Sequence, residues 1–195
     1  DRLGVIPTAA PLYYWADPQR LPWSAEEQSL LAEDEETHWL LEPFPAGAHG
    51  VAEGTPGSHS QLILWTYDIE AMEPVVPVPP IDPHYFEVVL RGLSRMIPGL
   101  QSYFDRLPRP VLDGGYYTKT RENRPFIGPL PVQGAYIIGA LSGFGIMAGC
   151  GAGELLAAYV TGGDVPSYAH RFLLERYDDP DYLSLLDNWD ASGQL

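Results

Sequence analysis

The sequence predicts an α+β protein, in which an antiparallel sheet with one helix packed on it is followed by a strand–turn–helix unit. Residues 84–97 place large apolar side chains at helical spacing, and prolines flank this segment at both ends. An apolar run over 135–141 leads into the glycine-rich turn 142–145, and a helical pattern follows over 146–160. These two segments carry the prediction of mixed helices and strands.

The part of the chain before the first predicted helix is dominated by strand and loop patterns. Residues 17–37 are polar and include the acidic run Glu33–Glu36, which we expect to be solvated. The stretch 47–60 is rich in Gly, Pro, Ser and His and predicts a loop, and the proline-rich stretch 73–83 predicts an extended connection. Strands are predicted for the apolar, aromatic segments 11–15, 39–44 and 61–67.

The C-terminal half begins with strand character over 108–120, centred on the glycine and tyrosine pairs at 114–117. A turn is predicted for 121–125, and a short helix for 166–177, followed by an acidic tail. We therefore divide the chain into an antiparallel domain over 1–120, a strand–turn–helix segment over 121–163, and a C-terminal helix and tail over 164–195.

Composition limits the function classes. The chain has 195 residues, 45% of them hydrophobic, and a formal net charge of −15, which argues against binding to nucleic acid or to anionic membranes. The single cysteine, Cys150, excludes an internal disulfide framework and a cysteine-based zinc site. We expect Cys150 to be a small buried packing residue in a cytoplasmic protein.

One segment could be read as a membrane span, because residues 134–153 contain no charged side chain. The first part of this segment is β-like and a glycine cluster interrupts it, so a strand–turn–helix explains it better. The chain opens without Met and without a basic, apolar leader, as if it were entered partway through a longer polypeptide.

The strand–turn–helix unit predicts a ligand site. A strand that delivers backbone N–H groups to the start of a helix can hold an anionic or electron-rich ligand. The side chains of Ser142, Gly143 and Gly145 are small, so a flat cofactor could approach the backbone. The usual nucleotide-binding glycine fingerprint is absent, which indicates that the chain supplies only half of such a site.

Three stretches in order carry a family resemblance: 115–120 (GYYTKT), 124–129 (RPFIGP) and 139–147 (GALSGFGIM). Their order and spacing resemble the C-terminal part of FAD-dependent amine and amino-acid oxidoreductases. This family includes D-amino-acid oxidase, glycine oxidase, monomeric sarcosine oxidase and dimethylglycine dehydrogenase. Residues 1–113 match the family's substrate domain only in length and order.

The resemblance implies a fold, a cofactor and partners. The strand at 135–141 and the helix at 146–160 would complete a Rossmann-like FAD domain supplied mainly by another segment or chain. That N-terminal FAD-binding polypeptide would be one partner, and a small amine or amino acid would be the substrate. The implied reaction is oxidation of a C–N bond by FAD.

The resemblance also implies site residues. Tyr117 would position the substrate, and Arg124 is a further candidate for substrate binding. No metal ligands are expected, because the five histidines show no metal-binding spacing. The turn and the start of the helix would contact the flavin through Ser142, Gly143, Phe144, Gly145, Ile146 and Met147.

The chain departs from the family at three positions. Gly115 aligns with a cysteine that can bind flavin covalently in some relatives, so we expect non-covalent FAD here. Tyr117 aligns with a carboxylate-binding arginine, and Met147 aligns with a lysine linked to oxygen reduction. Oxidase and dehydrogenase activities therefore both remain open, and the alternative is a non-catalytic subunit that retains the scaffold.

Three other side chains, Arg121, Trp65 and Tyr67, have simpler structural explanations. Arg121 is expected to form a surface salt bridge rather than to bind a ligand. Trp65 and Tyr67 are expected to be core or sheet residues, although an aromatic pocket would suit an amine substrate.

Overall fold

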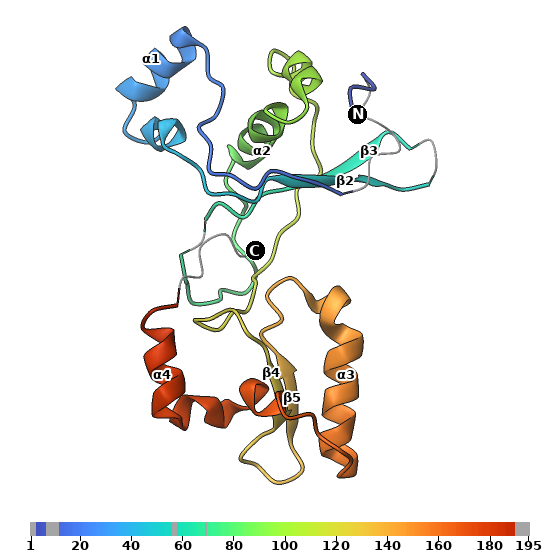
Figure 1. The fold of residues 1–195 in the computed structure, drawn as a ribbon. Coiled ribbons are helices and arrows are strands. Elements are labelled where there is room, and N and C mark those ends of the chain that lie inside the picture. The colour runs from blue at the N-terminus through green and yellow to red at the C-terminus, as the bar shows by residue number, and fades with distance from the viewer. Residues whose placement is uncertain (1–2, 7–11, 56–57, 69, 190–195) are drawn as a thin grey trace. The chain divides into compact units, whose positions relative to one another are not determined.

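The computed structural model describes residues 3–6, 12–55, 58–68 and 70–189. The chain divides into two compact units, 1–114 and 115–195, which are described separately below. Both units combine helices with a small antiparallel sheet, so the predicted α+β class is confirmed at that level (Figure 1).

The sheet of unit 1 has three antiparallel strands in the order β1 (Tyr13–Tyr14), β2 (His49–Glu53) and β3 (Ser60–Leu64). The strand predicted for 61–67 is confirmed in its first half. The loop predicted for 47–60 was wrong, because that stretch contains β2. Close packing in β2 requires a glycine at position 50, because a Cβ there would collide with the ring of Tyr13 on the neighbouring strand β1.

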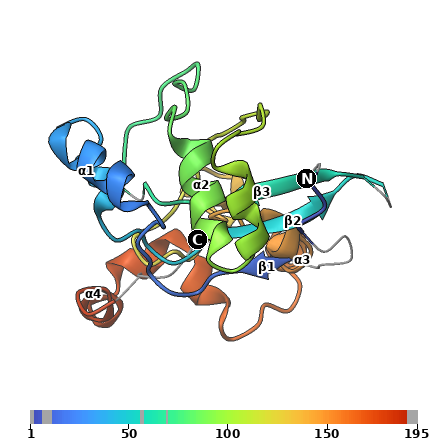
Figure 2. The same cartoon turned by 90° about the horizontal axis from the view of Figure 1, so that it is seen from above.

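Helix α2 (Tyr85–Ser94) confirms the helix predicted for 84–97 and covers the sheet of unit 1, as the view from above shows (Figure 2). Val88, Val89 and Leu93 on this helix are fully buried. Gly92 packs so closely against the ring of Trp65 that a Cβ would overlap it. Trp65 itself is 2% exposed, which confirms its prediction as a core residue.

Two elements of unit 1 correct the sequence predictions. Helix α1 (Ala25–Glu33) lies in the polar stretch 17–37, for which no helix was predicted. It buries no residue, so no apolar pattern announced it, and a capping box between Ser24 and Glu27 starts it. The segment predicted as a strand at 39–44 instead forms a 3₁₀ helix over His38–Leu41.

Arg91 links α1 to α2. Its side chain is 3% exposed, and its guanidinium lies 2.5 Å from Glu27 and 2.8 Å from Glu87. The rings of Trp23 and Phe104 lie 3.8 Å and 4.4 Å from it. Glu27, which completes the capping box of α1, is therefore also an ion-pair partner of Arg91 on α2.

Unit 2 contains a two-stranded antiparallel sheet, β4 (Phe126–Pro129) and β5 (Tyr136–Gly139), and the long helix α3 (Gly145–Thr161). The strand and helix predicted for 135–141 and 146–160 are confirmed. The strand character predicted over 108–120 was wrong, because residues 107–120 form neither helix nor strand. The core of unit 2 is small: Ile127, Ala152, Leu155 and Ala169.

The C-terminal segment differs from its prediction in detail. The helix expected for 166–177 is replaced by 3₁₀ turns over Ala169–Phe172 and Leu174–Asp178. Helix α4 (Pro180–Leu186) lies in the predicted acidic tail. The last residues of that tail, 190–195, lie outside the described part of the chain. Pro11 of the first predicted strand also lies outside it. None of the helices described here has both the length and the apolar character needed to cross a bilayer.

Candidate functional site

The connection between β5 and α3 is a tight turn with left-handed backbone. Ala140, Ser142 and Gly143 have φ values of 56°, 50° and 83°. L-residues adopt this conformation rarely, so two non-glycine residues here mark a constrained backbone. The amide of Phe144 donates to the carbonyl of Leu141 at 2.8 Å, which closes the turn directly before the helix.

Tyr117 lies against this turn. A Cβ built on Gly143 would be 3.1 Å from Cε1 and 3.3 Å from Cζ of the Tyr117 ring, so the ring occupies the space that a side chain would need. Tyr117 is 47% exposed, and the ammonium of Lys119 lies 5.9 Å from its ring centre. Burial lowers the pKa of Lys119. The structure therefore brings together Tyr117 and Gly143, which the sequence predicted to belong to one site.

The start of α3 is open. No side chain caps the helix at Phe144, so its first amide groups have neither an intrahelical acceptor nor a side-chain cap. Ile146 is 99% exposed and Met147 is 72% exposed, whereas Ser142 is buried. Two large apolar side chains thus flank a group of backbone donors at the positive end of a helix dipole.

Arg124 makes its contacts elsewhere. Its guanidinium lies 5.0 Å from the ring centre of Trp189, and its carbonyl accepts hydrogen bonds from Thr120 and Arg176. Its backbone amide donates to Thr120 Oγ1 at 2.9 Å. Arg124 is thus a structural member of the 120–125 turn, and the contacts described here do not join it to Tyr117, the other predicted substrate-binding residue.

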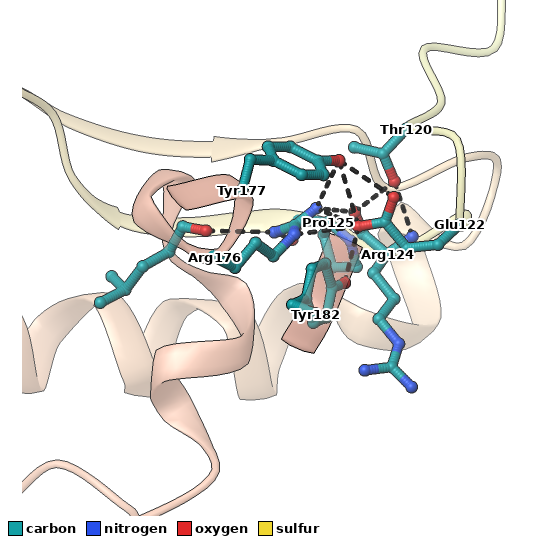
Figure 3. A network of polar contacts seen from close by, with 8 residues as sticks. Thr120, Glu122, Arg124, Pro125, Arg176, Tyr177 and Tyr182 are labelled. Atoms are coloured by element: carbon teal, nitrogen blue, oxygen red, sulfur yellow. Dashed lines mark hydrogen bonds and ion pairs between the residues drawn. The ribbon is translucent and has the colours of Figure 1, made fainter. Parts of the chain in front are cut away.

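The 120–125 turn is anchored by a buried polar network that the sequence did not reveal (Figure 3). Glu122 has a fully buried side chain and lies 2.7 Å from the guanidinium of Arg176, which is 2% exposed. The hydroxyls of Tyr177 and Tyr182 donate to the same carboxylate at 3.0 Å and 2.9 Å. Arg176 also donates to the carbonyl of Pro125 at 3.0 Å.

The network controls the ionisation of its carboxyl group. Burial acts to raise the pKa of Glu122, but a backbone hydrogen bond, the two tyrosine hydroxyls and the charge of Arg176 outweigh burial. The pKa of Glu122 is therefore lowered, and the group is ionised at neutral pH. Glu122 and Arg176 are 54 positions apart, so no local sequence signal could have paired them.

Three glycines in the middle of α3 face open space. A Cβ at Gly149, Gly151 or Gly153 would meet nothing within 4 Å. Cys150 on the same helix is exposed, so its prediction as a buried packing residue was wrong. Only Ala152 and Leu155 of this helix are buried, although most of its residues are apolar.

Arg121 forms a surface ion pair with Asp187 at 3.4 Å, as expected, and both side chains are well exposed. Within the described ranges, no three His, Cys, Asp or Glu side chains are grouped so that they could hold a metal ion.

Comparisons with known proteins yielded no match: no family model, no curated protein and no solved structure is significantly similar to this chain.

Proposed function

We propose that this chain is the substrate-binding and flavin-capping part of an FAD-dependent oxidoreductase that oxidises a C–N bond of an amine or amino acid. The observation that supports it most is the contact of Tyr117 with Gly143 at the uncapped start of α3. An aromatic ring, small side chains at Ser142 and Gly143, and a helix start that Phe144 does not cap are what a flat, electron-accepting ring needs on one side.

FAD would supply acceptance of the hydride equivalent, and the chain would supply orientation and electrostatics. The first amides of α3, over 145–147, would donate to negative charge on the reduced ring, where the helix dipole favours it. Tyr117 would offer its hydroxyl to the substrate, and the nearby ammonium of Lys119 would attract a substrate carboxylate. Non-covalent binding is expected, because Gly115 offers no side chain for attachment.

The remainder of the cofactor site would come from a nucleotide-binding polypeptide or segment. This is supported by the exposure of Ile146 and Met147 and by the open glycines of α3. An apolar helix that buries only two of its residues is stabilised when another element covers it. The partner would approach the backbone of α3 closely at these glycines.

The first experiment titrates lumiflavin, which carries only the ring system, with the purified chain and follows flavin fluorescence. We expect the unsubstituted chain to quench lumiflavin fluorescence through contact with Tyr117, and the Ile146→Asp variant to quench it less. Val111→Asp is the matched control, since Val111 and Ile146 are both 99% exposed and neither substitution should affect folding. Equal titrations for the two variants, or no quenching at all, would refute the flavin-facing turn.

The second candidate function is a non-catalytic subunit that keeps the scaffold. It is favoured by the contacts of Arg124, which bind it to Trp189 and the 120–125 turn and not to Tyr117. Amine-dependent reduction of a dye by the flavin-containing assembly distinguishes the two functions. Flavin that binds but is never reduced by amines or amino acids would support the non-catalytic role.

A further inference from the structure

A hollow of about 470 Å³ lies on unit 1. Trp39, Tyr67, Asp68, Glu70 and Asp82 line it. Trp39 comes from the 3₁₀ helix after α1, Tyr67 follows β3, and Asp82 precedes α2. Three separate segments therefore converge on this space with aromatic rings and carboxylates only.

The aromatic walls of the hollow are held in place by other rings. The Trp39 and Tyr67 rings are 6.1 Å apart, and Tyr67 is stacked on Tyr85 at 5.7 Å. Phe44 contacts both, at 5.8 Å from Trp39 and 5.3 Å from Tyr67. The walls therefore do not need to rearrange before a ligand enters, which lowers the entropic cost of binding.

Among the residues that the structure describes, the carboxyl groups of the hollow have no basic ion-pair partner. In the part of unit 1 that the structure describes, none of Asp68, Glu70 and Asp82 forms an ion pair with a Lys or Arg side chain. Asp82 is fixed by the Tyr67 hydroxyl at 3.3 Å and by the amide of His84 at 2.8 Å. Burial, followed by the charge of Asp82, raises the pKa of Tyr67, so its hydroxyl stays protonated and donates.

We propose that this hollow binds a small organic cation with a methylated ammonium group. Aromatic faces attract such a cation through their quadrupoles, and uncompensated carboxylates add long-range attraction. A metal ion fits poorly, because the described residues offer no group of three ligands arranged for one and the walls are aromatic rings. The proposal does not depend on the proposed flavin function, since it uses residues of unit 1 alone.

The first test compares choline with 3,3-dimethylbutan-1-ol, which has the same shape but no charge. Isothermal titration calorimetry of the full chain should show choline binding, and the neutral compound should bind about tenfold more weakly or not at all. Comparable affinities for the two compounds, or no binding of choline, would overturn the proposal.

The second test removes charge without disturbing the rings. The double variant Asp68→Asn/Glu70→Gln changes two exposed side chains, so it should fold normally and weaken choline binding about fivefold or more. The matched control is Glu33→Gln/Glu36→Gln, which removes the same charge from an exposed run elsewhere. Equal losses in both variants would mean that only the net charge acts, and would overturn the site.

A third variant tests the aromatic wall. Trp39→Leu keeps an apolar side chain but removes the ring face, and should abolish measurable choline binding while the far-ultraviolet circular dichroism of the chain is retained. Tyr67→Phe, which keeps the ring, should retain most of the binding. If Trp39→Leu remained folded and bound choline within twofold of the unsubstituted chain, the cation–π role would be excluded.

Discussion

Glu122 and Asp187 are both paired with an arginine, but their surroundings differ completely. The Glu122–Arg176 pair is buried, with two tyrosine hydroxyls completing the coordination of the carboxylate. The Arg121–Asp187 pair is 61% and 74% exposed. Water screens the Arg121–Asp187 pair. Removal of Glu122 would instead leave the buried charge of Arg176 without solvent or a counter-charge.

Glu122→Gln should lower the free energy of unfolding by about 3 kcal/mol, because Arg176 then remains buried without its counter-charge. Asp187→Asn removes the same charge at the surface and should cost less than about 1 kcal/mol. Urea unfolding followed by far-ultraviolet circular dichroism measures both. Equal losses would show that the buried network contributes no more than a surface ion pair.

Acid should weaken the same network. Because folding lowers the pKa of Glu122, its contribution to stability is complete above the unfolded-state pKa of about 4.3 and is lost as the pH falls through the lower folded-state value. As the pH is lowered from neutral into the acid range, the free energy of unfolding measured with urea should therefore fall more for the unsubstituted chain than for Glu122→Gln. A constant difference between the two over this range would contradict the assignment.

At the scale of elements, α2 and α3 use glycine in opposite ways. Gly92 of α2 touches the ring of Trp65, where no additional atom fits. Gly149 of α3 faces open space, although the helix around it is apolar. Close packing within this chain explains Gly92, and the open space at Gly149 would allow the proposed partner to approach the helix closely.

Gly92→Ala should therefore destabilise the chain by about 1–3 kcal/mol, since the new methyl group overpacks the core against Trp65. Gly149→Ala should stabilise the isolated chain by up to about 1 kcal/mol, because alanine favours the helix and meets no neighbour. Thermal unfolding of the two variants checks the signs. A destabilising Gly149→Ala would mean that the outer face of α3 is already packed.

Across the whole molecule, the two units have cores of very different size. Unit 1 has an extensive apolar core that includes Trp65, Val88, Val89 and Leu93. The core cluster of unit 2 has four buried apolar residues, and the unit also contains the buried Glu122 network. A small core buries less apolar surface, so unit 2 is expected to be the less stable unit.

Urea should therefore unfold the chain in two steps. Trp15, Trp23, Trp39 and Trp65 belong to unit 1, whereas Trp189 is the tryptophan of unit 2. Helix α3, the longest of those described, contributes strongly to the circular dichroism. The dichroism transition should begin at a lower urea concentration than the tryptophan fluorescence transition. Coincident transitions would show that the units unfold together.

Local sequence patterns predicted those elements that are determined by residues close together in the chain. Helix α2 follows from its apolar spacing and its proline boundaries, and β5 and α3 follow from an apolar run, a glycine turn and a helical pattern. No apolar pattern predicts helix α1, because it buries no residue, and the composition of β2 is typical of a loop.

What the residue order determined about this protein is its class, its main helices and the turn at 142–145, because apolar spacing, proline and glycine act over a few positions. The tertiary structure alone decided that Tyr117 lies on Gly143, that Glu122 meets Arg176, and that Trp39 and not Trp65 faces the hollow beside Tyr67. These contacts join residues far apart in the chain, and their partners are chosen by packing and burial of charge, which leave no periodic trace in the sequence.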